Sequence, residues 1–373
     1  MTSPLRILIS GGGTGGHIFP ALSIAAALER RHPGCEILFV GAEDRMEMTR
    51  VPAAGYKIEG LPVAGFYRRK LWRNFGVLIK LFRSLRKARA IVRDFRPDVA
   101  VGVGGYASGP VLKAAQRAGI PTVLQEQNSY AGVTNRLLAS KARAVCVAYK
   151  GMERFFPAET IILTGNPVRK ALGDCSMSVQ EARSSLGMNP DRPLLLVVGG
   201  SLGARTLNDA MATALADGSA AAAPFDILWQ TGKTDHARCA ELYAAHPAPN
   251  VKVTEFISDM AAAYRAATVV VSRAGAGTIS ELQDLGKASI LVPSPNVTED
   301  HQRHNAEALV ECDAAMMVLD ADAPAKLWAQ AEALMADSAR IKAMEAAASA
   351  MALREADEKI VDAIDRVVAQ TKD

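Results

Sequence analysis

The feature that most constrains this fold is a strand, a glycine-rich turn and a helix that occur twice along the chain. The first copy, ILISGGGTGGHIFPALSIAAAL, begins at Ile7, and the second, LLLVVGGSLGARTLNDAM, runs from Leu194 to Met211. Each is followed by β-branched or leucine-rich runs that alternate with longer helical patterns, which is typical of a parallel sheet covered on both faces. Two such openings predict an α/β protein with two Rossmann-like domains rather than one large sheet.

The length and the breaks in the pattern place the domain boundaries. A chain of 373 residues is too long for one ordinary core and fits two domains of about 150–190 residues each. Glycines and prolines concentrate between Thr164 and Pro193, which is typical of a hinge. We therefore expect an N-terminal domain over residues 1–165, a C-terminal domain over residues 166–340 and a helical segment over residues 341–373.

The hydrophobic pattern also predicts individual elements. The strands expected in the first half are Leu5–Ser10, Glu36–Val40, Val99–Val103, Thr122–Gln125 and Ala144–Ala148. Those expected in the second half are Leu194–Val198, Asp226–Gln230, Val251–Thr254, Thr268–Ser272 and Ser289–Val292. Helices fall between them, for example over Ala21–Arg31, Ala204–Leu215 and Ile279–Leu285.

Composition excludes several classes of protein. A hydrophobic content of 49% with 22% charged residues is ordinary for a globular chain and excludes a disordered or fibrous one. The five cysteines are scattered and form no C-x-x-C pair, which argues against a disulfide framework and a zinc site. No stretch resembles a signal peptide or reaches the roughly 18 apolar residues of a membrane span. We expect a cytoplasmic protein whose membrane contact, if it has one, is peripheral.

The loop after the first strand, Gly11 to His17, contains G-x-G-x-x-G. Glycines let a phosphate approach the backbone, and the following helix adds its positive end. The competing interpretation is a dinucleotide-binding turn, whose third glycine lies inside the helix. Because proline is favoured at the first helical position, Pro20 predicts a longer loop and disfavours a nicotinamide coenzyme. His17 either makes a structural hydrogen bond, or it binds the substrate or acts as the catalytic base.

Two further glycine-rich turns follow strands in the second half. The first holds Ser201 and enters a helix directly, which fits either a tight turn or an anion site. In the second, Thr278 and Glu281 form either a capping box, T-x-x-E, or part of a ligand site. In that site the carboxylate binds a ribose diol and the helix N-terminus holds a diphosphate. Glycine-rich turns at strand ends in both halves are better explained by the binding of a nucleotide and a second anionic substrate than by a purely structural role.

Three polar segments complete the candidate chemistry. Glu126 to Asn128 follow a strand, at the edge of the sheet where α/β proteins bind ligands. Residues 300–305 offer amide and imidazole groups suited to sugar hydroxyls. The pair His301 and His304 lacks a supporting carboxylate spacing, and the D-x-D that begins at Asp320 fits a helix N-cap better than a metal ligand set. We therefore expect no metal site.

A basic stretch without a single acid runs from Gly60 to Arg93. Its apolar residues at helical spacing are Trp72, Phe75, Ile79 and Phe82. Three interpretations are open: these groups face the core, they belong to a nucleic-acid patch, or they enter a membrane surface whose anionic headgroups meet the cations. No nucleic-acid-binding module accompanies the stretch, so we expect no nucleic-acid partner and favour the membrane surface.

Eight segments in this order resemble the MurG family of bacterial glycosyltransferases and span nearly the whole chain. They are GGGTGGHIFPALSIAAAL, GVGGYASGP, QEQNSYAGVTNR, GNPVR, VVGGSLGA, EFISDMAAAY, SRAGAGTISEL and EDHQRHNA. The resemblance implies transfer of N-acetylglucosamine from UDP-N-acetylglucosamine to undecaprenyl-pyrophosphoryl-N-acetylmuramyl-pentapeptide, which converts lipid I to lipid II in peptidoglycan synthesis. It also implies the GT-B glycosyltransferase architecture: two Rossmann-like domains separated by a cleft, with a C-terminal helix that crosses back to the first.

The resemblance further implies roles for individual residues. Those implied to bind the donor are Thr14, Gly15, Gly16, Asn128, Arg169, Ser201, Ile257, Gly275, Ala276, Gly277, Thr278, Ile279, Ser280, Glu281 and Gln302. Glu281 is implied to hold the ribose and Ile257 to contact the uracil. Those implied to face the acceptor diphosphate are Gly13, Thr14, Gly15, Gly16, His17, Gly104, Gly105 and Tyr106. Phe75, Ile79 and Phe82 fall where the family carries an exposed apolar patch.

The implied reaction inverts the anomeric carbon. Its base stays open among His17, the first candidate, Glu126 and the acceptor's own phosphate. Neither a metal nor another cofactor is required, because helix N-termini stabilise the leaving diphosphate. The implied partners are both substrates, an anionic membrane surface at the cytoplasmic face of the inner membrane, and cell-wall and division proteins. The alternatives are another GT-B UDP-sugar enzyme (a glycolipid synthase or a UDP-N-acetylglucosamine epimerase), a nicotinamide oxidoreductase and a non-catalytic membrane scaffold.

Overall fold

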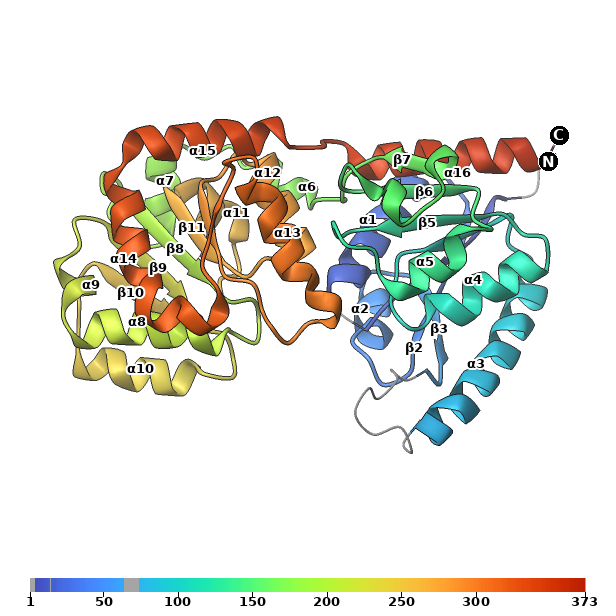
Figure 1. Ribbon diagram of the computed structural model, residues 1–373, viewed down its shortest axis with the longest axis horizontal. Helices are drawn as coiled ribbons and strands as arrows, with labels where there is room; N and C mark the ends of the chain where they lie inside the picture. The colour runs from blue at the N-terminus through green and yellow to red at the C-terminus, as the bar shows by residue number, and fades with distance from the viewer. Residues whose placement is uncertain (1–3, 14, 64–73, 373) are drawn as a thin grey trace. The chain divides into compact units, whose positions relative to one another are not determined.

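Two compact units make up the chain. The computed structural model describes residues 4–13, 15–63 and 74–372, with the side chains of residues 74–78, 170, 171, 298 and 372 outside that description. The N unit comprises Met1–Val168 and Leu353–Asp373, and the C unit comprises Arg169–Ala352. Each unit is built on a parallel sheet with helices packed against it (Figure 1). The predicted α/β class with two Rossmann-like sheets is confirmed.

The N unit holds a seven-stranded parallel sheet in the order β3-β2-β1-β4-β5-β6-β7. Its strands are β1 (Arg6–Ser10), β2 (Glu36–Ala42), β3 (Lys57–Leu61), β4 (Val99–Gly102), β5 (Thr122–Glu126), β6 (Ala144–Val147) and β7 (Ile161–Leu163). Its helices are α1 (Gly15–Arg31), α2 (Glu47–Ala53), α3 (Asn74–Phe95), α4 (Ser108–Arg117), α5 (Val133–Ala139) and α16 (Ala356–Lys372). Short 3₁₀ turns lie at Met152–Arg154 and Ala158–Thr160.

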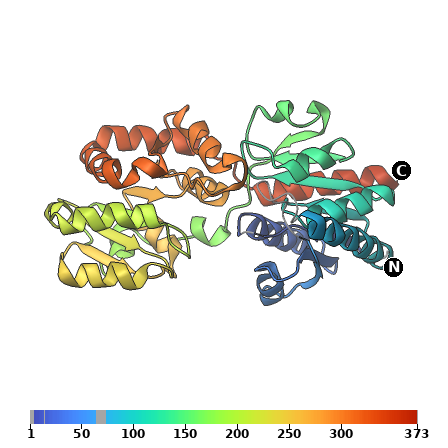
Figure 2. The same cartoon turned by 60° about the horizontal axis from the view of Figure 1, so that its bottom comes forward.

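Two hydrophobic cores lie on opposite faces of this sheet because the strand residues alternate between them. Ile7 and Ile9 share one core with α1 and α16, whereas Leu8 shares the other with α3, α4 and α5. The returning helix α16 therefore covers a face of a sheet that begins at the other end of the chain, and both termini lie in this unit (Figures 1 and 2).

Ion pairs join α16 to the last turn of α1. Arg30 contacts Asp357 and Glu358, each at 2.8 Å, and His32 Nε2 lies 2.8 Å from Asp365 Oδ1. The buried apolar side of α16, from Ile360 to Val367, faces the same core as α1. Apolar burial and a row of charges thus hold the two ends of the unit together.

The C unit holds a six-stranded parallel sheet in the order β10-β9-β8-β11-β12-β13. Its strands are β8 (Leu194–Val198), β9 (Asp226–Gln230), β10 (Val251–Thr254), β11 (Val269–Ser272), β12 (Ser289–Leu291) and β13 (Met316–Met317). Its helices are α6 (Lys170–Gly173), α7 (Val179–Ser185), α8 (Arg205–Ala216), α9 (Ser219–Ala222), α10 (His236–Ala245), α11 (Met260–Ala266), α12 (Ala276–Asp284), α13 (His301–Val310), α14 (Ala323–Ala336) and α15 (Ser338–Ala350), with 3₁₀ turns at Thr298–Asp300 and Asp320–Asp322. Helices α8, α10, α14 and α15 bury side chains in one core with the sheet.

Three strands that the sequence pattern does not predict are all edge strands. β3 and β7 close the two sides of the first sheet, and β13 closes one side of the second. Most of their residues are exposed or half-buried, so they lack the continuous apolar run that marks a central parallel strand.

Two expectations about boundaries need correction. The expected C-terminal segment, residues 341–373, divides: α15 stays in the C unit because Ile341 and Met344 are buried in its core, and the chain returns to the N unit at Leu353. Helix α1 begins at Gly15, so Pro20 lies inside it rather than at its first position. The loop before α1 is therefore short, and its length does not argue against a dinucleotide.

Candidate functional site

Each sheet reverses its strand order at one point, between β1 and β4 in the N unit and between β8 and β11 in the C unit. Loops that leave the carboxyl ends of the strands diverge at such a point, and α/β proteins bind ligands there. All three glycine-rich turns that the sequence singles out follow β1, β8 or β11. The predicted glycine-rich turns therefore lie at one switch point in each unit.

In the N unit the two loops at the switch point touch through their backbones. Gly13 has φ 92° and Gly105 has φ 84°, a region that side chains other than glycine rarely adopt. A Cβ atom at Gly105 would lie 2.3 Å from the Gly12 carbonyl oxygen. Glycine is required here both for its backbone angle and for the close approach of the two loops.

His17 lies on the first turn of α1, half-buried against the second loop. A Cβ atom at Gly104 would lie 2.8 Å from His17 Cδ2 and 2.9 Å from its Nε2, so the imidazole packs on the Gly104 backbone. Tyr106 follows in this loop and is 53% exposed. The structure thus brings together four of the predicted acceptor-side residues (Gly13, His17, Gly104 and Gly105), while Thr14 lies outside the described residues.

A buried carboxylate that the sequence does not reveal holds the first loop in place. Glu47, the first residue of α2, is 1% exposed and accepts the N–H of Gly13 at 3.1 Å on each oxygen. It also accepts the N–H of Ala42 at 2.9 Å. Gly13 and Glu47 lie 34 positions apart in the sequence. An acid at the start of a helix is common, so nothing in the sequence indicates that Glu47 bonds the first loop.

Glu126 is a second buried carboxylate, at the end of β5. Its Oε1 accepts the backbone N–H and the side-chain amide of Asn128, at 3.1 and 3.2 Å. Its Oε2 accepts the N–H of Gly132 at 3.0 Å and the amide of Asn135 at 2.9 Å. Burial raises the pKa of Glu126, and these four donors oppose that shift. The carboxylate therefore organises the loop from Asn128 to Asn135.

In the C unit a buried amide, Gln230, ties the loop after β8 to the loop after β10. Its Nε2 donates to the Gly200 carbonyl at 3.0 Å, and its Oε1 accepts the Ile257 N–H at 3.0 Å. Ser201 on the first loop is exposed, whereas Ile257 is buried. Gln230 thus holds the loops of two predicted donor-binding residues, Ser201 and Ile257, next to each other. The only sign of this role in the sequence is that a polar residue ends an otherwise apolar strand.

The loop after β11 leads directly into α12. Gly275 is the N-cap residue in an extended conformation, and α12 begins at Ala276. Thr278 therefore lies inside the helix and its side chain does not cap it, so of the two interpretations the capping box is wrong. The first-turn N–H groups of a helix have no acceptor within it, and a Cβ atom at Gly277 would meet nothing within 4 Å. This helix end can accept an anion against its backbone.

Glu281 lies one turn further along α12, with its side chain 13% exposed. Its Oε1 accepts Arg169 Nε at 3.0 Å and Nη2 at 2.8 Å, and its Oε2 accepts the Tyr264 hydroxyl at 3.0 Å. Burial and the nearby charge of Glu281 raise the pKa of Tyr264 well above its usual value, so this hydroxyl stays a donor. The carboxylate is oriented from two sides.

Gln302, on α13, ties its helix to the loop after β12, because its Oε1 accepts the Ser294 N–H at 2.9 Å. Asp322 occupies the N-cap position of α14, but its side chain bonds Lys326 at 3.1 Å instead of capping the helix. Asp320 accepts hydrogen bonds from Thr206 and Arg273. Within the described ranges no three His, Cys, Asp or Glu side chains gather to hold a metal ion.

The exposed stripe that the sequence predicts on α3 is present where side chains are described. Ile79 is 50% exposed and Phe82 is 70% exposed, whereas Ala88 and Ile91 face the core. The interpretation that Ile79 and Phe82 face the core is therefore wrong. Trp72 and the side chain of Phe75 lie outside the described residues. No helix in the described part of the chain is long and apolar enough to cross a membrane.

Comparison with known proteins identifies the relatives of both units. Residues 7–147 match the N-terminal domain of glycosyltransferase family 28, and residues 194–364 match its C-terminal domain. A Bacteroides thetaiotaomicron protein named UDP-N-acetylglucosamine–N-acetylmuramyl-(pentapeptide) pyrophosphoryl-undecaprenol N-acetylglucosamine transferase is 57% identical over 95% of each chain. A Porphyromonas gingivalis protein of the same name is 50% identical over 99% of this chain and 97% of its own.

Among solved structures, MurG of Acinetobacter baumannii superposes with a TM-score of 0.78 at 29% identity, over 97% of this chain and all of its own. A UDP-GlcNAc 2-epimerase from Neisseria meningitidis has a TM-score of 0.66 at 13% identity, over 97% of this chain and all of its own, which shows a shared fold alone. The predicted GT-B architecture is thereby confirmed.

Proposed function

Because the chain belongs to glycosyltransferase family 28, we propose that it transfers N-acetylglucosamine from UDP-N-acetylglucosamine to undecaprenyl-pyrophosphoryl-N-acetylmuramyl-pentapeptide. The product is lipid II of peptidoglycan synthesis. The observation that carries the proposal is an identity of 50–60% to relatives named for this activity, over 87–99% of the chain. The organisation of the site supports it, since each unit has glycine-rich turns at the switch point of its sheet and the reaction joins two phosphate-bearing substrates.

The C unit is the proposed donor site. The N–H groups at the start of α12 and the small residues Gly275 to Gly277 suit the diphosphate of UDP, and Glu281 suits the ribose diol. The uracil lies beside Ile257, on the loop that Gln230 holds next to Ser201. Arg169, which bonds Glu281, and Gln302 complete the set.

The N unit is the proposed acceptor site. Glu47 takes the Gly13 N–H, so we assign the acceptor diphosphate to the N–H groups of Gly15 and Gly16 at the start of α1. The second loop, with Gly104 and Gly105, forms the other wall.

We assign the base to His17. Its imidazole is half-buried beside the acceptor loops, whereas both oxygens of Glu126 already accept hydrogen bonds from the loop that they organise. The 4-hydroxyl oxygen of the acceptor attacks the anomeric carbon while the bond to the UDP oxygen breaks. The electron pair leaves with UDP, the hydroxyl proton passes to His17, and the anomeric carbon inverts. The positive end of α12 offsets the charge of the leaving diphosphate, so the step needs no metal.

We propose that the protein works at the cytoplasmic face of the cell membrane as a peripheral protein. An undecaprenyl acceptor stays in the bilayer, and Ile79 and Phe82 are exposed on a helix rich in lysine and arginine. Apolar groups that enter the interface and cations that meet anionic headgroups are the two contributions to such binding.

One assay tests the reaction. The purified protein is given radiolabelled UDP-N-acetylglucosamine and a short-chain lipid I analogue, and the product is identified by mass and linkage. We expect a disaccharide lipid with a β-1,4 linkage and free UDP. Two results would contradict the proposal. Release of an epimerised sugar would indicate a UDP-N-acetylglucosamine epimerase, and UDP-sugar binding with no transfer would indicate a non-catalytic scaffold.

A further inference from the structure

Glu47 is a buried carboxylate that takes no direct part in the proposed reaction. It is 1% exposed, and its oxygens accept the Gly13 N–H at 3.1 Å and the Ala42 N–H at 2.9 Å. Within the described ranges no lysine or arginine pairs with it. A hydrophobic side chain of similar size would be buried here at a lower cost in free energy, which indicates a role for the hydrogen bonds themselves.

Two glycines make room for this carboxylate. A Cβ atom at Gly12 would lie 2.1 Å from Glu47 Oε1, and one at Gly41 would lie 2.5 Å from Glu47 Cγ. A side chain at either position would collide with the glutamate. The loop after β1 and the end of β2 therefore both pack closely on Glu47, which leaves the backbone of the first loop little freedom to move.

Close backbone contacts continue from this loop to His17. A Cβ atom at Gly105 would lie 2.3 Å from the Gly12 carbonyl oxygen, so the second loop packs on the first. The preceding residue, Gly104, packs on the imidazole of His17, since a Cβ atom there would lie 2.8 Å from His17 Cδ2. Because closely packed groups transmit displacements, a shift of the loop that Glu47 holds would reach the imidazole.

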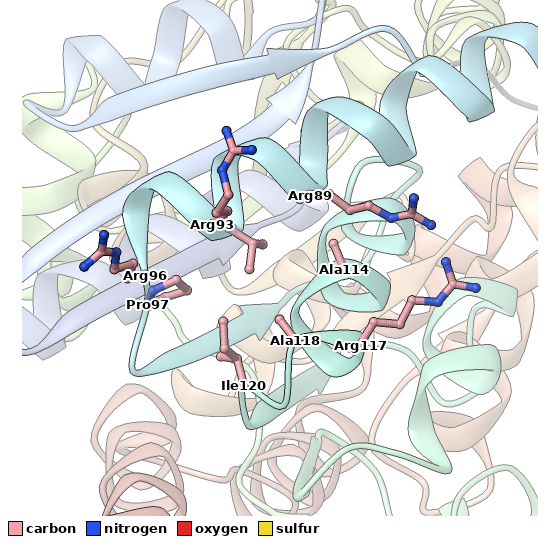
Figure 3. Close-up of a pocket in the computed structure, with 9 residues that line it drawn as sticks. Arg89, Arg93, Arg96, Pro97, Ala114, Arg117, Ala118 and Ile120 are labelled. Atoms are coloured by element: carbon pink, nitrogen blue, oxygen red, sulfur yellow. The ribbon is translucent and has the colours of Figure 1, made fainter.

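The surface hollow of about 480 Å³ between α3 and α4 shows no comparable convergence of polar groups (Figure 3). Arg89, Arg93, Arg96 and Arg117 line it, but their guanidinium groups point apart rather than into it. One small ligand would not meet them together. Around Glu47, by contrast, backbone groups from two elements meet on one carboxylate.

We propose that Glu47 is a positioning residue for the transfer reaction and acts through His17. By holding the Gly13 N–H it fixes the first loop, and with it the place of the imidazole at the start of α1. A displacement of about 1 Å at a reacting group can lower a rate by about 100-fold, so a contact remote from the chemistry can control turnover. The inference rests on the proposed function, in which His17 is the base.

The test is a double-mutant cycle on the full chain with Glu47→Gln and His17→Ala. The amide in Glu47→Gln has nearly the volume of the carboxylate, but it offers one acceptor oxygen and turns its NH₂ group toward backbone N–H donors. We expect Glu47→Gln alone to lower turnover at saturating acceptor by about 100-fold. In the His17→Ala background the same change should have little effect, because residues that act as a unit are not additive. Calorimetric titration should give wild-type UDP affinity throughout.

Controls separate positioning from stability. Glu43→Gln makes the same substitution at an exposed position, where Glu43 bonds Lys87 at 3.4 Å, and should leave turnover unchanged. Ile91→Ala removes a core side chain of the N unit and should lower the melting temperature without lowering turnover at temperatures where the protein is folded. If calorimetry shows that Glu47→Gln does not fold, Glu47→Asp replaces it in the cycle. The aspartate keeps the charge but is one methylene too short to hold the loop in the same place.

The outcomes are distinct. Near-normal turnover in the Glu47 variant would overturn the inference, as would additive losses in the cycle or an equal loss in Ile91→Ala. Near-normal turnover in His17→Ala would overturn it as well, by removing the base through which Glu47 acts. If the wild type transfers no N-acetylglucosamine, it is the proposed function that fails.

Discussion

The two units place their glycine loops at the same topological position but hold them with opposite chemistry. In the N unit, the buried carboxylates Glu47 and Glu126 accept backbone N–H groups of the site loops. In the C unit, the neutral amide Gln230 joins two loops, and Arg169 orients the one acidic site residue, Glu281. The loops of the N unit are therefore held by buried acids that accept their N–H groups, whereas those of the C unit are held by an amide. We propose that the first arrangement serves the acceptor and catalysis, and that the second serves affinity for the donor.

The largest effect expected from this comparison is at His17. We expect His17→Ala to lower turnover by about 10²–10⁴-fold, the usual contribution of a general base, with donor affinity nearly unchanged because the donor site lies in the other unit. Steady-state kinetics at saturating acceptor, together with calorimetric titration of UDP, measure both quantities. His246→Ala, an exposed histidine of the C unit, is the control. Near-normal turnover would remove His17 as the base.

The second prediction concerns the buried acid Glu126. Glu126→Ala removes the carboxylate that accepts the Gly132 N–H and one hydrogen bond each from the Asn128 and Asn135 amides, and a buried donor that loses its acceptor costs about 1–3 kcal/mol. We expect the free energy of unfolding of the N unit to fall by about 3 kcal/mol or more in urea titrations, with UDP still bound by the C unit. Glu126→Gln separates the two roles, because it keeps one acceptor oxygen but cannot take a proton. A stable Glu126→Gln protein whose turnover falls like that of His17→Ala would make Glu126 the base.

The third prediction moves to the C unit. Glu281→Ala should weaken the binding of UDP and of UDP-N-acetylglucosamine together, by about 1.5–3 kcal/mol for hydrogen bonds to a charged group. Turnover at saturating donor should change less than affinity. Calorimetric titration of both ligands measures the loss, and Glu241→Ala removes the same charge from an exposed position. Unchanged UDP affinity in the folded variant would show that Glu281 does not bind the donor.

The smallest expected effect is at Tyr264, which positions Glu281 through its hydroxyl. Tyr264→Phe removes one hydrogen bond to the carboxylate, so we expect a loss of about 0.5–1.5 kcal/mol in UDP affinity. The ratio of affinities for UDP and 2′-deoxy-UDP should also fall, because a less ordered carboxylate distinguishes the ribose hydroxyl less well. A lower melting temperature with an unchanged ratio would show that the hydroxyl acts on stability alone.

The sequence predicts the central strands well and the ends of elements poorly. All ten expected strands are present. Most are central strands with a continuous apolar run, and the edge strand β10 still alternates valine with polar residues, whereas the edge strands β3, β7 and β13 are missed. Pro20 marks no helix start: α1 begins five residues earlier, with glycines in its first turn. Thr278 and Glu281 have the spacing of a capping box, but the extended backbone of Gly275 starts α12 before either of them.

The sequence predicts site residues only where they lie in or beside a recognisable local motif. Glycine-rich turns mark the loops, so His17, Ser201 and Glu281 can be named as candidates before the structure is known. The residues that hold those loops are distant in sequence: Glu47 bonds Gly13, and Gln230 bonds Gly200. Such contacts exist only once the sheet has brought the strand ends together, so no spacing rule predicts them.

The return of the chain at Leu353 has a consequence for biosynthesis. The C unit is contiguous, so it can close as soon as residue 352 has left the ribosome, whereas the N unit still lacks the later side chains from Ile360 to Val367 at that point. Until then, the apolar surface of α1 and β1 that α16 will cover faces the solvent. The usual order of folding, in which the N-terminal domain folds first during synthesis, is therefore reversed. A nascent chain of this design exposes its N unit to chaperones longest, and damage to α16 destabilises the half of the protein that was made first.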